Sequence, residues 1–332
     1  VNITHKQLAT NIAQREASWP TLEGTENVLC VMPLFHVFAS SMALHLAVFC
    51  KGVLNILRQY HPEKVLNTIS QKKITILPVG PTIFIGLMGH QNFNTTDFSS
   101  LRVAYSGSAP LPEEILRRWE RLTNCPILEG YGQSESGPVI SAVAEGSPAI
   151  VGSVGKALMD TEIQIVDVET GVEVLGVGLQ GEIRVRGPQV MSGYRNRPVE
   201  TAEALRGGWL YTGDIGELDS SGNLYIRDRK KDLVIVSGYN VYPREIDEVL
   251  YLHKDIADVA TVGVLDDYRG EIICSCVKLG KGSVIKPDDL ITFCKKHLAS
   301  YKVPQKITIL KEMPKTTVGK TDKLAVKRLL ST

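Results

Sequence analysis

Segments with strand-like and helix-like patterns alternate along about the first 140 residues, and this alternation most constrains what the chain can fold into. Apolar runs at 27–35, 53–58 and 74–79 have the length and composition of buried strands. Residues 61–70 and 111–122 each place a proline at an early position and then apolar residues at helical spacing. Strands and helices that alternate in this way predict an α/β sheet with helices on its faces.

The pattern changes after about residue 148. From there to about residue 230, short segments that alternate apolar and polar residues are separated by glycine-rich turns, which is typical of antiparallel strands or a small β-barrel. Helical and extended segments then alternate over a length normal for a small α+β domain. The charged segment 227–232 is the best boundary. We therefore predict a large domain over 1–230, with an α/β part at about 1–147 and a β-barrel-like part at about 148–230, and a small domain over 231–332.

Charge and cysteine usage narrow the possible partners and the compartment. The chain has 37 basic and 36 acidic residues, and a net charge of +1 does not favour a nucleic-acid or acidic membrane surface. The six cysteines form no CxxC pair, which indicates a reducing, cytoplasmic compartment. Cys274 and Cys276 are expected on one face of a strand. The apolar stretch 74–89 contains two prolines and is shorter than the ~20 residues that a membrane helix needs, so no membrane span is predicted.

Two stretches carry more small and polar residues than a plain turn requires. In 105–111, "YSGSAPL", small residues let backbone amides approach a base or a phosphate, although an ordinary strand–helix turn explains this stretch better in isolation. In 129–136, "EGYGQSES", Tyr131 offers a flat ring, Ser134 a hydroxyl and Glu135 a hard oxygen suited to magnesium. The alternative for this second stretch is an exposed polar loop.

Two further stretches contain charges at glycine-marked turns. Asp214 follows an aromatic–Thr–Gly sequence, and one carboxylate can accept hydrogen bonds from both hydroxyls of a ribose, with Arg229 assisting at the sugar or a phosphate. Residues 319–321 read Gly-Lys-Thr, but a Walker A loop needs glycine where this chain has Pro314. Lys320 is therefore either an ordinary solvated charge or a cation that a loop holds in place for a function.

Taken together and in this order, these stretches resemble the adenylate-forming superfamily of acyl-CoA synthetases, firefly luciferase and peptide-synthetase adenylation domains. The resemblance extends over essentially the whole chain, and it implies the C-terminal part of a large AMP-binding domain followed by a mobile C-terminal AMP-binding domain. The phosphate loop of the superfamily precedes a stretch like "VNITHKQL" at 1–8, so we expect that loop and the subdomain before it to lie outside this chain. The matching stretches are 33–39, 105–111, 131–136, 181–201, 208–214, 227–250 and 314–323.

The resemblance also implies an activity, that of an ATP-dependent carboxylate–CoA ligase using ATP, Mg²⁺ and CoA. By resemblance, Lys320 acts on the carboxylate and the α-phosphate during adenylation, and Lys231 occupies the hinge about which the small domain rotates. Gly238 would then border the pantetheine tunnel, His36 would gate the acyl pocket, and Glu135 would contact the metal. The nucleotide-binding residues implied in this way are Gly107, Ser108, Ala109, Glu129, Gly130, Tyr131, Gly132, Ser134, Asp214 and Arg229.

The acyl substrate is less closely determined. The candidate pocket residues are Phe38, Met42, Thr82 and Val139, to which Ser108 and Gly132 add small surfaces. No arginine belongs to this set, so a dicarboxylate is disfavoured and a fatty or aryl acid is favoured. The alternatives are a stand-alone adenylation domain, a luciferase-like oxygenase, and a non-catalytic nucleotide- or acyl-binding fragment that lacks the phosphate loop. The sequence does not indicate an oligomeric state.

Overall fold

The computed structural model describes residues 1–332 except 110, 148–149, 267, 281, 317–319 and 331–332. The chain divides into two compact units. The first unit consists of Val1–Thr212 and Gly216–Ile226, and the second unit consists of Gly213–Ile215 and Arg227–Thr332. In the described ranges, no helix has both the length and the apolar character needed to cross a bilayer.

The first unit is built on a seven-stranded sheet in the order β2-β1-β3-β4-β5-β6-β7. The five strands from β2 to β5 are parallel, whereas β5, β6 and β7 pair antiparallel. This parallel core confirms the α/β sheet that the alternating segments predict. The strands are β1 (Asn27–Cys30), β2 (Val53–Ile56), β3 (Ile76–Val79), β4 (Val103–Ser106), β5 (Ile127–Gly132), β6 (Val139–Ala142) and β7 (Lys156–Ala157).

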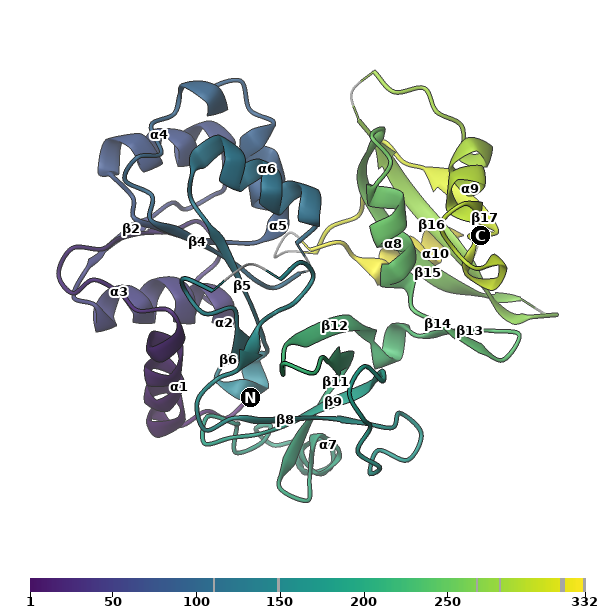
Figure 1. Ribbon diagram of the computed structural model, residues 1–332, viewed down its shortest axis with the longest axis horizontal. Helices are drawn as coiled ribbons and strands as arrows, with labels where there is room; N and C mark the ends of the chain where they lie inside the picture. Colours follow the sequence, from purple (N-terminus) through teal and green to yellow (C-terminus); the bar gives the residue numbers. More distant parts are fainter. Residues whose placement is uncertain (110, 148–149, 267, 281, 317–319, 331–332) are drawn as a thin grey trace. The chain divides into compact units, whose positions relative to one another are not determined.

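Helices cover both faces of this sheet (Figure 1). One apolar core joins α4 (Pro62–Lys72), α5 (Pro81–Met88) and α6 (Glu113–Thr123) to one face. A second core lies on the opposite face, where the end of α1 meets the helical run 37–49. Successive strand residues alternate between these cores, as the pleat of a strand requires; Val28 belongs to the second and Leu29 to the first. The helical segments on this second face are α1 (His5–Ser18), α2 (Val37–Ala39), the π-helical η1 (Ser40–His45) and α3 (Leu46–Phe49).

A separate five-stranded sheet follows in the first unit, and its order is β10-β11-β9-β8 with β12 paired to β11. The antiparallel pairs β8–β9 and β10–β11 match the alternating apolar and polar pattern of this region. Its core contains Ile165, Ile183 and Leu224. The elements are β8 (Glu162–Val166), β9 (Gly181–Arg186), α7 (Pro198–Ala204), β10 (Leu205–Arg206), β11 (Trp209–Leu218) and β12 (Leu224–Arg229).

The second unit is an α+β fold around a sheet in the order β14-β13-β16-β15, with β17 parallel to β16. Helices α8 and α9 pack on one face, and α10 packs on the other. Cys274 and Cys276 both belong to the core beneath α10, which confirms that they share one face of a strand. The elements are β13 (Val234–Val236), β14 (Tyr239–Val241), α8 (Pro243–Tyr251), β15 (Ile256–Asp266), β16 (Gly270–Leu279), α9 (Pro287–Lys295), β17 (Lys306–Ile309) and α10 (Lys323–Leu330).

Candidate functional site

The loop after β4 leaves the carboxyl end of a central parallel strand, which is where α/β sheets usually bind ligands. Gly107 is buried there, and a Cβ atom at this position would lie 2.8 Å from Cε2 of Phe38. Only glycine leaves room for that ring. Ser108 follows with φ of 71°, a left-handed conformation, so the chain turns sharply at once. The loop 107–109 is therefore fixed by close packing, and Ala109 is exposed at its end.

The predicted acyl residues come together only in part. Phe38 packs against the same core that contains Met42 and Val139, and both of these are almost fully buried. The amide of Asn11 holds the strand at Val139 with two hydrogen bonds, from Val139 N at 3.0 Å and to Val139 O at 2.8 Å. Thr82 is exposed in the first turn of α5 and does not belong to this core.

His36 begins the helical run 37–49. Its ring Nδ1 accepts a hydrogen bond of 3.2 Å from Phe38 N, so the imidazole caps α2. The side chain is half-buried. This contact ties the orientation of His36 to the backbone position of Phe38, the residue that packs on Gly107.

Close backbone approaches also shape the stretch 129–132, which forms the end of β5. A Cβ atom at Gly130 would lie 2.5 Å from the Trp19 ring, and one at Gly132 would lie 1.9 Å from the carbonyl oxygen of Pro138. Glu129 is buried, and Tyr131 packs against the core of the five-stranded sheet of the first unit. Close packing alone therefore explains why glycine occupies positions 130 and 132, which the sequence also predicts to be part of a ligand-binding loop.

Glu135 lies in the 3₁₀ turn η3 (Ser134–Ser136), which also contains Ser134. Its carboxylate Oε1 accepts a hydrogen bond of 2.8 Å from the phenol of Tyr194, and its main-chain oxygen accepts one of 2.8 Å from Met191 N. Burial, and then the hydrogen bond and charge of Glu135, raise the pKa of Tyr194 to about 12, so the phenol stays a donor at neutral pH. Sequence reasoning missed Tyr194, although it lies within the matching stretch 181–201.

One carboxylate at Glu135 fits a magnesium ion that takes its other ligands from phosphates and water. Across the residues that the structure describes, no group of three or more His, Cys, Asp or Glu side chains could enclose a metal. The donor set therefore fits a metal that arrives with a substrate, and it does not fit a closed structural metal site.

The second unit brings three predicted residues together. Asp214, in the portion of β11 that belongs to this unit, is nearly buried, and its Oδ1 lies 3.4 Å from Nε of Arg229. Lys320 is half-buried. Burial lowers the pKa of Lys320, the positive charge of Arg229 lowers it further, and the negative charge of Asp214 opposes both. Two cations thus converge beside one carboxylate, an arrangement that suits a bound anion.

Lys231 lies two residues after Arg229, and Gly238 lies further along the chain. Ser237 and Gly238 form the two-residue turn between β13 and β14, with φ of 49° and 84°. Two left-handed residues in a two-residue hairpin are the signature of a type I′ turn. No heavy atom lies within 4 Å of a Cβ atom built on Gly238, so the backbone conformation, and not crowding, requires glycine here. Lys231 is exposed in η4 (Lys230–Asp232).

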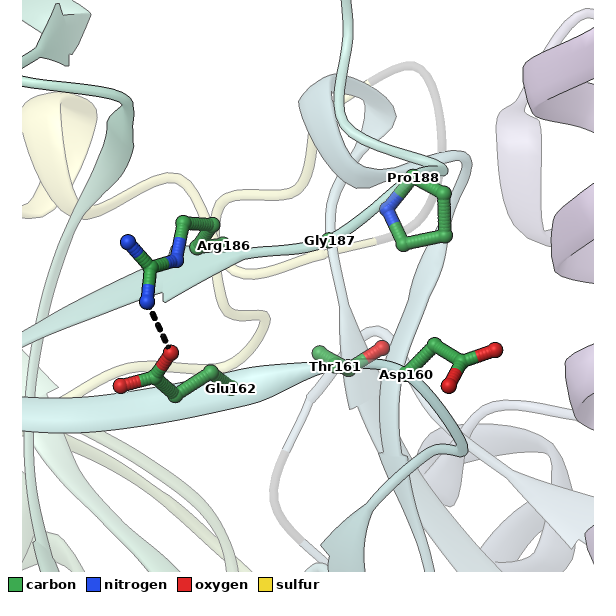
Figure 2. Close-up of a pocket in the computed structure, with 6 residues that line it drawn as sticks. All are labelled: Asp160, Thr161, Glu162, Arg186, Gly187 and Pro188. Atoms are coloured by element: carbon green, nitrogen blue, oxygen red, sulfur yellow. Dashed lines mark hydrogen bonds and ion pairs between the residues drawn. The ribbon is translucent and has the colours of Figure 1, made fainter.

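A hollow lies elsewhere in the first unit (Figure 2). Arg186 and Glu162 point toward one another across it and form an ion pair of 2.5 Å. None of the residues predicted from sequence lines this hollow, and it is wide open to solvent, so it is not a candidate for the reaction site. Its lining consists of Asp160, Thr161, Glu162, Arg186, Gly187 and Pro188.

Comparison with known families gives two matches. The AMP-binding enzyme family model matches residues 1–195, and the AMP-binding enzyme C-terminal domain matches residues 245–320. Lys320 is the last residue of the second match. Asp214, Arg229, Lys231 and Gly238 lie between the two matched segments.

Similar proteins include a long-chain-fatty-acid–CoA ligase of Bacillus subtilis (strain 168), 41% identical over 322 residues, which cover 96% of this chain and 57% of the relative. A 4-coumarate-CoA ligase 1 of Narcissus pseudonarcissus is 32% identical over 329 residues, covering 96% of this chain and 60% of the relative. The chain thus spans less than two thirds of the length of these relatives.

Solved structures agree with these matches. ATP-bound MatB from Rhodopseudomonas palustris aligns with a TM-score of 0.93 and 29% identity, over 99% of this chain and 65% of that one. The amide bond synthetase McbA from Marinactinospora thermotolerans aligns with a TM-score of 0.90 and 29% identity, over 99% and 67%.

Proposed function

This chain belongs to the AMP-binding enzyme family, and we propose that the protein is an ATP-dependent carboxylate–CoA ligase. In the first step, a carboxylate oxygen of the acid attacks the α-phosphorus of ATP, so acyl-AMP forms and pyrophosphate leaves. In the second step, the CoA sulfur attacks the acyl carbonyl carbon, a thioester forms and AMP leaves. The thiol proton passes to solvent.

The observation that carries this proposal is the cluster of Asp214, Arg229 and Lys320. Burial and the charge of Arg229 lower the pKa of Lys320, and Asp214 opposes both, so the three charges of the cluster leave one positive charge for an incoming anion. The α-phosphate and the carboxylate of the acid are such anions, and negative charge grows on their oxygens as they react. A point cation held in a partly desolvated place stabilises that charge without rearrangement, and Asp214 can accept hydrogen bonds from the ribose hydroxyls.

Contacts with the nucleotide base, and with the metal that accompanies the phosphates, are assigned to residues of the first unit. The backbone of 107–109 and 129–132 is held by buried packing at the carboxyl ends of β4 and β5, which suits a flat base and the adjoining sugar. Ser134 offers a hydroxyl in the same turn as Glu135. Mg²⁺, when bound with ATP, neutralises charge on the phosphates, and Glu135, held by Tyr194, would be its protein ligand.

The acid is proposed to be a fatty acid. Phe38, Met42 and Val139 belong to one apolar core and contain no charged group, which favours an uncharged acyl chain. The name and the 41% identity of the Bacillus subtilis relative support the same substrate class. The 4-coumarate-CoA ligase relative makes an aryl acid the alternative.

For the thioester step, we assign Gly238 to the path of the pantetheine arm and Lys231 to the hinge. The exposed type I′ turn at Gly238 presents little side-chain bulk. Lys231 is exposed in η4, shortly after the chain passes from the first unit to the second at Arg227, which suits a hinge residue.

The test is to measure ATP–pyrophosphate exchange and acyl-CoA formation by the full-length protein with a panel of fatty and aryl acids, with and without CoA. We expect acid-dependent ATP–pyrophosphate exchange with or without CoA, and acyl-CoA only when CoA is present. Exchange without acid dependence would refute the proposal. Product formation with amines but not with CoA would instead assign an amide synthetase, the activity named for McbA.

A further inference from the structure

The loop that carries Lys320 is closed at its base by paired backbone. Lys315 and Thr321 form an isolated antiparallel bridge. Thr316 N donates a 2.7 Å hydrogen bond to the carbonyl of Lys320, and Asp322 N donates one of 2.9 Å to the carbonyl of Pro314. Residues 317–319, between these contacts, lie outside the described residues. Lys320 therefore belongs to the paired base of the loop.

The side chain of Lys315 links this base to the sheet of the second unit. Its Nζ donates to Oδ2 of Asp258 at 2.5 Å and to the hydroxyl of Thr321 at 2.9 Å. The side chains of Lys315 and Asp258 are 32% and 19% exposed, so water screens this ion pair less than it screens an ordinary surface pair. One ammonium group thus joins strand β15 to the residue next to Lys320.

Asp258 is itself held from the opposite side. The phenol of Tyr251, at the end of α8, donates a 2.9 Å hydrogen bond to Oδ1 of Asp258. Burial, followed by the charge of Asp258, raises the pKa of Tyr251, so this phenol stays protonated and continues to donate. Both carboxylate oxygens of Asp258 are therefore occupied, and Lys315 is bound to a group that has little freedom to move.

The chain on either side of the loop is also anchored. Met313 lies in the core formed with Val326 and Leu330 of α10. The carboxylate of Asp322 accepts a 3.0 Å hydrogen bond from Ala325 N at the start of that helix. These contacts anchor the chain on both sides of the loop. The side chain of Lys315 adds a separate link, from the base of the loop to strand β15.

We propose that Lys315 is a positioning residue for Lys320, acting through its bonds to Asp258 and Thr321, and this inference rests on the proposed function. A catalytic cation works only when its charge meets the reacting oxygens, and a displacement of about 1 Å can cost as much as 10²-fold in rate. Lys315 is occupied by two protein oxygens, so its contribution reaches the reaction through Lys320. The proposed role concerns adenylation alone, because only that step uses Lys320.

The test compares Lys315→Met with Lys315→Arg in the full-length protein. In single turnovers, Lys315→Met should slow acyl-AMP formation about tenfold and leave thioester formation from supplied acyl-AMP within about twofold of the parent. Lys315→Arg retains the charge and several donors, so it should recover most of the rate. Thr321→Val, which removes the acceptor hydroxyl without a change of charge, should lower the same step.

A matched control is Lys278→Met. Lys278 forms a 2.8 Å ion pair with Glu312 in the same unit, and it has no hydrogen bond or ion pair with the described residues of 314–322. Amide hydrogen exchange provides a second measurement that needs no activity. Exchange in a peptide covering 314–323 should become faster in Lys315→Met and stay unchanged in Lys278→Met, because only the first variant releases the base of the loop.

Three results would overturn the inference: unchanged adenylation in Lys315→Met, an equal loss of both half-reactions, or an equal loss in Lys278→Met. If the parent protein shows no acid-dependent adenylation, the proposed function fails. Hydrogen exchange still decides in that case whether Lys315 holds the loop. A parent that adenylates normally while Lys315→Met behaves identically refutes the positioning role alone.

Discussion

The loop at Gly107 in the first unit and the loop at Lys320 in the second unit are held by different forces. In the Gly107 loop, the backbone packs so closely against the Phe38 ring that no side chain fits at position 107. The base of the Lys320 loop is held by hydrogen bonds and one ion pair, from Lys315 and the paired backbone. Packing tolerates almost no added volume, whereas a polar loop tolerates new side chains and depends on charge. Substitutions should therefore affect mainly stability in the first loop and mainly catalysis in the second.

The sharpest test of the second half of this comparison is Lys320→Ala. Removal of a preorganised cation from developing phosphate charge should slow acyl-AMP formation by roughly 10²–10³-fold. Thioester formation from supplied acyl-AMP should remain near the parent rate, and the free energy of unfolding should change little because Lys320 is only half-buried. Single-turnover kinetics of the two half-reactions provide the measurement. An equal loss in both would make Lys320 a structural residue.

Asp214→Ala should have the next largest effect. The loss of charge-assisted hydrogen bonds to the ribose hydroxyls costs roughly 1.5–3 kcal/mol, so the KM for ATP should rise at least about tenfold. Because the lost hydrogen bonds would go to the ribose, the nucleotide, and not the acid, should bind more weakly. Steady-state kinetics with ATP and acid varied separately would check this. Unchanged ATP kinetics would remove Asp214 from the site.

Gly107→Ala tests the packing half of the comparison. A methyl group 2.8 Å from the Phe38 ring must displace that ring, which should lower the free energy of unfolding by about 1–3 kcal/mol. In the double variant with Phe38→Leu, the smaller side chain should make room for the methyl group and reduce this cost. Denaturant unfolding of the four proteins in the cycle measures the coupling. Additive losses would show that the Phe38 ring is not what excludes a side chain at 107.

The smallest effect on stability is expected at Gly238, where the backbone conformation favours glycine although no neighbouring atom would clash with a side chain. Gly238→Ala must adopt φ near 84°, which should cost about 1 kcal/mol of the free energy of unfolding. Gly238→Asn should cost less, because asparagine accepts left-handed backbone more readily. Thermal unfolding of both variants gives the comparison. Equal stability of the alanine and asparagine variants would contradict the conformational explanation.

Local pattern was enough to locate most elements. Proline at the start of 61–70 and 111–122 predicted helices that form at 62–72 and 113–123. The apolar run 74–79, predicted as a buried strand, forms strand β3 at 76–79. The run 27–35 was longer than its strand, which ends at Cys30. Val31 is still buried, whereas Leu34 and Phe35 are exposed. An apolar run therefore indicates neither where backbone pairing stops nor where burial stops.

The candidate site was less accessible from sequence, because its contacts join distant residues. Tyr194 contacts Glu135 across 59 positions, and Lys315 contacts Asp258 across 57. Neither pair has a spacing signal, since the strands and turns that bring the partners together are set by sheet order. Thr82, chosen with the acyl residues, lies exposed on α5, because the position of one residue on a short helix depends on how that helix packs.

By itself, the sequence determined the α/β class, the order of elements and the family, since these follow from local burial patterns, turn chemistry and matching motifs. The tertiary structure alone decided which residues meet. It placed the Phe38 ring on Gly107, converged Arg229 and Asp214 near Lys320, and closed the Lys320 loop with Lys315. The physical reason is that propensity and periodicity act over a few residues, whereas a contact between distant residues depends on the pairing and packing of whole strands and helices.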